Sequence, residues 1–159
     1  MPRTLTAKDF KKVQNQIGFC GIWCGSCVVG NGALREMTKR YEDVVKSYGL
    51  EGWAPNDFSF KEFAKGLSSI QNMPLCPGCL KGGGRDNCEM KACAMSRKIS
   101  ECIECDQTTA CKNHETLKNM RTGAQDAGIF VKTEKVNRKE LVKKWTTELK
   151  SKCPHQILF

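Results

Sequence analysis

The stretch FCGIWCGSC, residues 19–27, places three cysteines within nine residues. Their spacing, C-x3-C-x2-C, is compatible with an iron–sulfur cluster, with part of a zinc site, or with the start of a disulfide framework. Outward from this stretch, seven more cysteines lie within residues 76–111, together with a triple glycine and little apolar periodicity. Such a segment cannot build a core by side-chain burial alone, so we expect crosslinks to hold it.

The cysteine count and the rest of the sequence favour metal ligation over disulfides. The chain has 159 residues and 11 cysteines, an odd number that fits a disulfide framework poorly. Its first 19 residues lack the apolar stretch of a signal peptide, and the longest apolar run, near residues 127–131, is too short for a membrane span. These features predict a cytoplasmic protein, and thiols stay reduced in that compartment.

Three C-x2-C pairs carry the metal prediction, because a tight turn between two cysteines brings both thiolates to one ion. A structural zinc ion takes four such ligands, so the chain has enough cysteines for two ions. Our preferred division places Cys24, Cys27, Cys76 and Cys79 on one Zn²⁺ ion (the first cysteine set) and Cys93, Cys102, Cys105 and Cys111 on another (the second cysteine set).

The remaining three cysteines and the two histidines are residue types that can also bind metal. Cys20, Cys88 and His114 are additional candidate ligands, and the sequence does not assign them to either set. Cys153, alone near the C-terminus, is interpreted as an ordinary thiol, and His155 as a solvated residue.

Iron is the alternative metal, because a [4Fe–4S] cluster is also held by cysteine thiolates. The C-x3-C-x2-C spacing occurs in radical enzymes that use S-adenosylmethionine, but those enzymes need a partial barrel too large for this chain. The alternative hypothesis is therefore an iron–sulfur protein that transfers electrons or senses redox state.

The segments around the cysteines have amphipathic periodicity. Helices are predicted over residues 6–16, from Asn31 to Gly49, and from the capping sequence SFKE at residues 59–62. A further helix with Leu117 and Met120 inside follows residue 111. The last helix begins near Asn137, and its apolar stripe comprises Leu141, Val142, Trp145 and Leu149.

Together these elements predict a mostly α fold with irregular metal-stapled loops: a small cysteine-rich zinc-knuckle domain with an inserted helical pair and a C-terminal helix. One domain is expected over residues 1–159. Its metal-binding core would combine residues 18–27 with 76–114, the helical insertion would span 28–75, and the helical tail 115–159.

The charge distribution raises a nucleic-acid alternative. The formal net charge is +9, and residues 112–159 carry 11 basic and 5 acidic side chains. We interpret this basic segment as a solvated helix face, since no zinc-finger spacing with paired histidines accompanies it. The residues available for phosphate contacts would be Lys132, Lys135, Arg138, Lys139, Lys143 and Lys144.

Catalysis is not predicted. The chain has only two histidines, no G-x-S-x-G and no P-loop; its GGGR at residues 82–85 lacks the Lys-Ser/Thr that a phosphate cradle needs. A metal-stapled module that binds an unknown protein partner accounts for the cysteines without any such constellation.

Three segments, GFCGIWCGSC, LCPGCLKGGG and CEMKACAMSRKISECIECDQTTAC, together resemble DUF3795, a family of small prokaryotic proteins of unknown function. The resemblance covers residues 18 to about 120 and implies metal binding, usually taken as zinc. Two features depart from the family pattern. Gln156 stands where a second cysteine of a C-terminal knuckle is usual, and DQTTAC lacks the usual aromatic–proline step.

Overall fold

The computed structural model describes residues 15–107 and 110–158, with the backbone alone for residues 152–158. Within these ranges the chain is helical, with no β-strand, which confirms the mostly α prediction. The α-helices are α1 (Ala33–Ser47), α2 (Phe60–Gln71), α3 (Glu89–Ser96), α4 (His114–Asp126) and α5 (Arg138–Leu158). Short 3-10 helices are η1 (Cys24–Ser26), η2 (Leu50–Trp53), η3 (Cys79–Lys81) and η4 (Cys102–Glu104).

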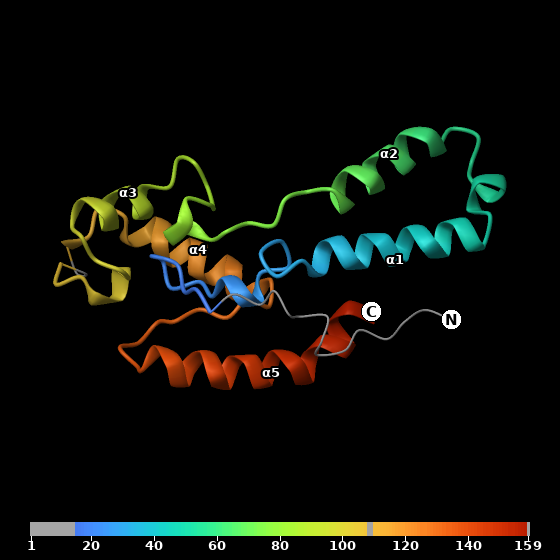
Figure 1. Ribbon diagram of the computed structural model, residues 1–159. Helices are drawn as coiled ribbons and strands as arrows, with labels where there is room; N and C mark the ends of the chain where they lie inside the picture. The colour runs from blue at the N-terminus through green and yellow to red at the C-terminus, as the bar shows by residue number, and fades with distance from the viewer. Residues whose placement is uncertain (1–14, 108–109, 159) are drawn as a thin grey trace.

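Two regions are visible in Figure 1: a body that contains the cysteine-bearing loops, α3, α4 and α5, and an arm formed by α1, η2 and α2. We call residues 33–71 the arm and the remaining described residues the body. The two helices of the arm run side by side and extend away from the body (Figure 1).

The core of the body is built around Trp23, whose side chain is 0% exposed. Its ring stacks on Trp145 of α5 with centroids 5.7 Å apart, and Phe130 contacts both rings, at 5.6 Å from Trp145 and 5.9 Å from Trp23. Ile17, Val142 and Leu149 complete this cluster. The predicted apolar stripe of the last helix is therefore confirmed, and its partner is the residue between the first cysteines.

Backbone hydrogen bonds fix residues 16–24 against a distant segment. The Trp23 N–H donates to Phe130 O at 2.9 Å, and the Lys132 N–H donates to Gly21 O at 2.8 Å. Isolated bridges join Ile17 to Trp23 and Ile22 to Val131. These contacts hold the first cysteine stretch between the start of the described chain and the segment before α5.

The arm follows the sequence prediction closely. Gly49 adopts the left-handed conformation (φ 59°) just after α1, and Ser59 caps α2 by accepting a hydrogen bond from the Glu62 N–H at 3.4 Å. Asn31 accepts from the Ala33 N–H at 2.9 Å, but the N-cap position is Gly32. Asn31 thus shapes the turn before α1 and is not its cap.

This agreement between sequence and structure is not seen for α3, Trp53 or residues 6–16. Residues 89–96 form α3, although the segment 76–111 shows little periodicity, because a helix of only 8 residues leaves too few turns for a stripe. Trp53, the last residue of η2, is 82% exposed. The helix predicted over residues 6–16 lies outside the described residues except for its last two positions, which are not helical.

None of the helices in the described part of the chain combines the length and the apolar character that crossing a bilayer requires.

Candidate metal centre

The first C-x2-C pair is shaped by a 3-10 turn. η1 begins at Cys24, and the Cys27 N–H closes the turn by donating to Cys24 O at 3.2 Å. Side chains three residues apart eclipse in this conformation, so the turn directs both thiols to one side. The Asn31 amide donates to Gly25 O at 3.0 Å and ties this turn to the start of α1.

The second pair of the first set, Cys76 and Cys79, is shaped by Pro77 and Gly78. Gly78 is buried and has φ 85° and ψ 153°, a conformation that side-chain-bearing residues rarely adopt. A Cβ at this position would also collide with the side-chain amide of Gln16. This explains the glycine that the sequence places inside CPGC.

Gln16 joins these two pairs, a role that sequence reasoning missed. Its Oε1 accepts from the Leu80 N–H at 2.9 Å, and its Nε2 donates to Pro77 O at 3.2 Å. Its own carbonyl accepts from the Cys24 N–H at 2.9 Å. An isolated glutamine four residues before the first cysteine carries no sequence signal, because its partners are 61 and 64 residues away.

The electrostatics of Cys24 show that the first set is brought together. The pKa of the Cys24 thiol is raised to about 12, first by burial and then by Cys79, Cys76 and Cys27 in that order. Each of these neighbours is thus near enough to disfavour a second negative charge. A bound cation would reverse this repulsion and stabilise the thiolates.

The second set surrounds a pocket of about 270 Å³ between α3 and α4. Cys102 and Cys105 lie at the two ends of the η4 turn, which the Cys105 N–H closes onto Cys102 O at 3.2 Å. Cys93 comes from α3, and Cys111 precedes α4. His114, the exposed first residue of α4, also lines the pocket, whose surface is largely apolar.

Two buried nitrogen atoms beside this pocket have no hydrogen-bond partner among the described residues. They are Nδ2 of Asn113, a residue 3% exposed, and Nη2 of Arg121. Both residues line the pocket together with the four cysteines. Buried donors are normally paired, so these two nitrogen atoms are unsatisfied polar groups at the edge of the pocket.

The comparisons with known proteins bear on this pattern. A family model described as a protein of unknown function, DUF3795, matches residues 16–116. The chain belongs to this family. The match covers both cysteine sets and stops at the start of α4, so Phe130 and Trp145, which complete the aromatic core, lie beyond it. No curated protein and no solved structure matches the chain.

In this DUF3795 protein Cys20 lies between the two sets. Burial raises the pKa of its thiol, a hydrogen bond from the Ile22 backbone lowers it, and Cys79 and Cys88 raise it again. Cys20 also affects the pKa of Cys102. That pKa is raised to about 11, first by burial and next by Cys20, while Arg121 acts to lower it. Cys20 is therefore a neighbour of both sets, and Cys88, just before α3, is a neighbour of Cys20.

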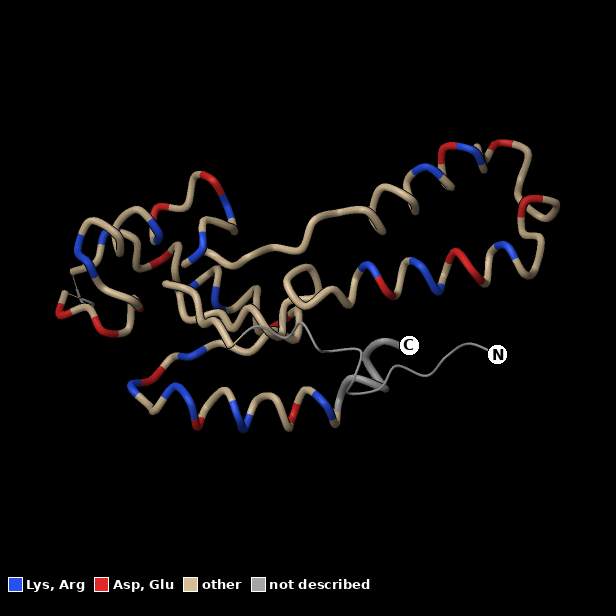
Figure 2. Tube along the Cα trace, in the orientation of Figure 1, with Lys and Arg blue, Asp and Glu red and all other residues tan. Residues whose placement is uncertain are grey.

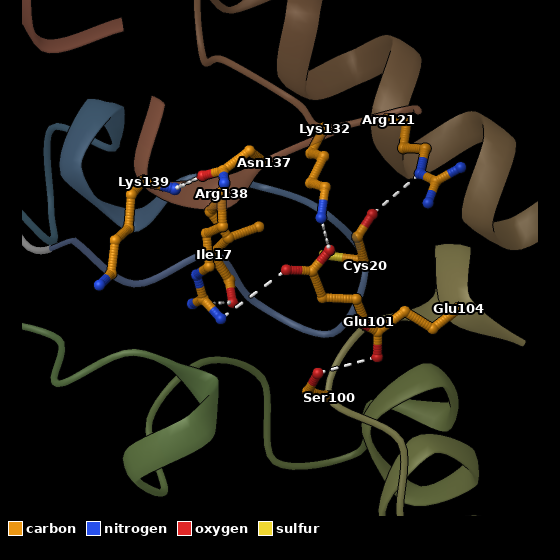
Figure 3. Close-up of polar contacts among 10 residues, drawn as sticks. All are labelled: Ile17, Cys20, Ser100, Glu101, Glu104, Arg121, Lys132, Asn137, Arg138 and Lys139. Atoms are coloured by element: carbon orange, nitrogen blue, oxygen red, sulfur yellow. Dashed lines mark hydrogen bonds and ion pairs between the residues drawn. The ribbon is translucent and has the colours of Figure 1, made fainter. Parts of the chain in front are cut away.

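A buried ion pair connects the second set to the C-terminal part of the DUF3795 protein (Figure 3). The Glu101 carboxylate, directly before Cys102, pairs with Lys132 and, at 3.7 Å, with Arg138. Glu101 is 2% exposed and Lys132 6%. No sequence signal marks Glu101. The prediction that Lys132 could contact phosphates is wrong, since its ammonium is buried against this carboxylate.

The donor chemistry of both sets is sulfur alone. Among the residues that the structure describes, no three His, Cys, Asp or Glu side chains have the close spacing of a formed metal site. In each set the thiols therefore lie near one another without converging on one point. Glu101, a buried carboxylate beside the second set, is already paired with Lys132. The side chains of Cys153 and His155 lie outside the described residues.

Proposed function

We propose that this DUF3795 protein is a metal-stapled interaction module in which two structural Zn²⁺ ions hold the body together. Cys24, Cys27, Cys76 and Cys79 would bind one ion, and Cys93, Cys102, Cys105 and Cys111 the other. Zinc bound in this way supplies folding free energy and no chemistry. The zinc-knuckle description of the fold belongs to the same proposal.

One observation carries the proposal: within each proposed set, cysteines that are distant in sequence lie near one another in the structure. Cys24 is electrostatically coupled to Cys76 and Cys79, and the four cysteines of the second set line one pocket. Soft thiolate ligands favour zinc or iron–sulfur clusters over magnesium or calcium.

The test is the metal content of cysteine variants. The purified protein should contain two zinc ions per chain by elemental analysis. Cys24→Ser and Cys105→Ser should each remove one ion, and the matched control Cys153→Ser should remove none. A folded protein without bound metal would contradict the proposal, and so would equal metal loss in the control.

The geometry of the second set also favours one alternative, a [4Fe–4S] cluster that would make the protein an electron carrier or redox sensor. Its four cysteines border a pocket of about 270 Å³, and none of the described thiols converge on a single point. A cluster fills such a space, whereas a single ion draws its ligands together. Anaerobic purification decides: a brown protein absorbing broadly near ~400 nm would replace zinc with iron.

A further inference from the structure

The arm exposes an apolar surface that its own two helices cover only in part, since Tyr41 and Phe58 each contact Phe63 of α2. Ten large apolar side chains are exposed among the described residues, and five of them lie between residues 41 and 58. Contiguous exposed apolar surface on a small protein marks a contact site. The five residues are Tyr41, Val44, Tyr48, Trp53 and Phe58, with Trp53 82% and Tyr48 73% exposed.

Three of these residues belong to a stripe along α1. Met37, Tyr41, Val44 and Tyr48 are spaced four, three and four residues apart, the seam that one helix presents to another. Tyr41, Val44 and Tyr48 are 52%, 40% and 73% exposed. We call Met37, Tyr41, Val44 and Tyr48 the open stripe.

α2 packs on an adjoining face of α1, which meets the open stripe at Tyr41, whose ring lies 6.1 Å from that of Phe63. The Arg35 guanidinium donates to Gln71 O at 2.7 Å, Glu42 accepts from the Gln71 amide, and Val45 is 2% exposed. At 100° per residue, the open stripe is centred about a quarter of a turn from this face. A helix in a four-helix bundle contacts two neighbours in that relation, and the arm supplies only one of them.

The charge of the arm indicates which molecule packs on the open stripe. Residues 33–71 carry six basic and six acidic side chains, whereas the whole chain has a net charge of +9. Figure 2 shows both signs along α1 and α2. Two molecules with this charge repel each other, except where their neutral arms meet. An acidic protein or a nucleic acid would instead be drawn to the basic remainder of the chain.

We infer that the protein forms a dimer in which the arms of two copies pack through their open stripes into a four-helix bundle. The contact is two-fold symmetric, since the same stripe is used on both copies. Neither cysteine set lies in the arm, so the dimer is independent of the identity of the metal.

Light scattering after gel filtration of the full metal-bound chain tests the inference. At about 100 µM the mass should be twice 17.8 kDa. The double variant Val44→Glu/Tyr48→Glu should weaken the dimer by roughly a hundredfold or more, because it buries carboxylates without partners. Circular dichroism checks that the variant keeps its helices.

Lys39→Glu is the matched control, because it changes the charge by the same two units. Lys39 lies on the side of α1 opposite the open stripe and is exposed. This variant should remain dimeric. A monomeric wild-type protein would overturn the inference, and so would a dimer that survives the double variant or that Lys39→Glu disrupts equally.

Discussion

The body and the arm are stabilised by different kinds of interaction. The arm uses ordinary helix signals: a serine cap, a left-handed glycine and pairs of apolar residues. The body has one small aromatic cluster, a buried ion pair and loops rich in half-buried cysteines. A region with so little apolar core needs crosslinks, whereas a helical hairpin needs only a partner surface. The following experiments test this difference, beginning with the largest expected effect.

Removal of metal should affect the body far more than the arm. A strong chelator should cost on the order of 10 kcal/mol per zinc site and unfold the body. In a Trp53→Phe background, tryptophan fluorescence reports only Trp23 and Trp145, which stack in the body. Their emission should shift to that of exposed indole, while hydrogen exchange in α1 changes less. Unchanged emission after complete metal removal would show that the body is not metal-stapled.

Trp23→Ala should destabilise the protein by about 3–5 kcal/mol, because it removes the centre of the aromatic cluster. The change is read as a lower free energy of unfolding in urea. Trp53→Ala makes the same substitution in the arm at an 82% exposed position. It should change stability by less than about 0.5 kcal/mol. Comparable losses in the two variants would place the core elsewhere.

Glu101→Gln should cost about 3 kcal/mol, because it leaves the buried Lys132 ammonium without a counter-charge. Glu104→Gln is the control, since Glu104 is exposed and accepts only a hydrogen bond from Ser100 Oγ at 2.9 Å. Its unfolding free energy should be close to that of the wild type. If both variants unfold alike, the Glu101 pair contributes nothing.

Two glycine substitutions should act with opposite signs. Gly78→Ala in the body should cost about 2 kcal/mol from its backbone conformation, with a further loss from the collision with Gln16. Gly66→Ala in α2 meets no atom within 4 Å and should stabilise the arm by about 0.5–1 kcal/mol. Thermal unfolding of both variants checks the signs. A neutral Gly78→Ala would mean that the CPGC turn tolerates a side chain.

The smallest effect is expected for the cap of α2. Ser59→Ala removes the hydrogen bond to the Glu62 N–H and should cost about 1 kcal/mol or less. Ser59→Asp keeps a capping oxygen and should restore stability. Hydrogen exchange of α2 amides measures the loss locally, and a loss that Ser59→Asp also shows would rule out capping as its cause.

The sequence alone determined the arm, the helical character of the C-terminal segment and the C-x2-C turns. Each of these depends on residues close together in the chain: caps, three- and four-residue spacings, and C-x2-C turns. Neighbouring residues set local backbone conformation, so a single sequence is enough to recognise them. The assignment of Lys132 to a solvated basic face failed because burial is not a local property.

Only the tertiary structure decided which distant residues meet. Gln16 reaches Pro77 and Leu80, Glu101 meets Lys132, and the rings of Trp23, Phe130 and Trp145 pack against one another. These contacts join segments without any common period or motif, and Gln16, Glu101 and Lys132 each look like ordinary surface residues in the sequence. The placement of Cys20 between the two sets is of the same kind. On the side of the second set it follows from the hydrogen bonds from Arg121 Nε to Cys20 O and from the Cys102 N–H to Phe19 O, which hold the opening stretch against α4 and η4.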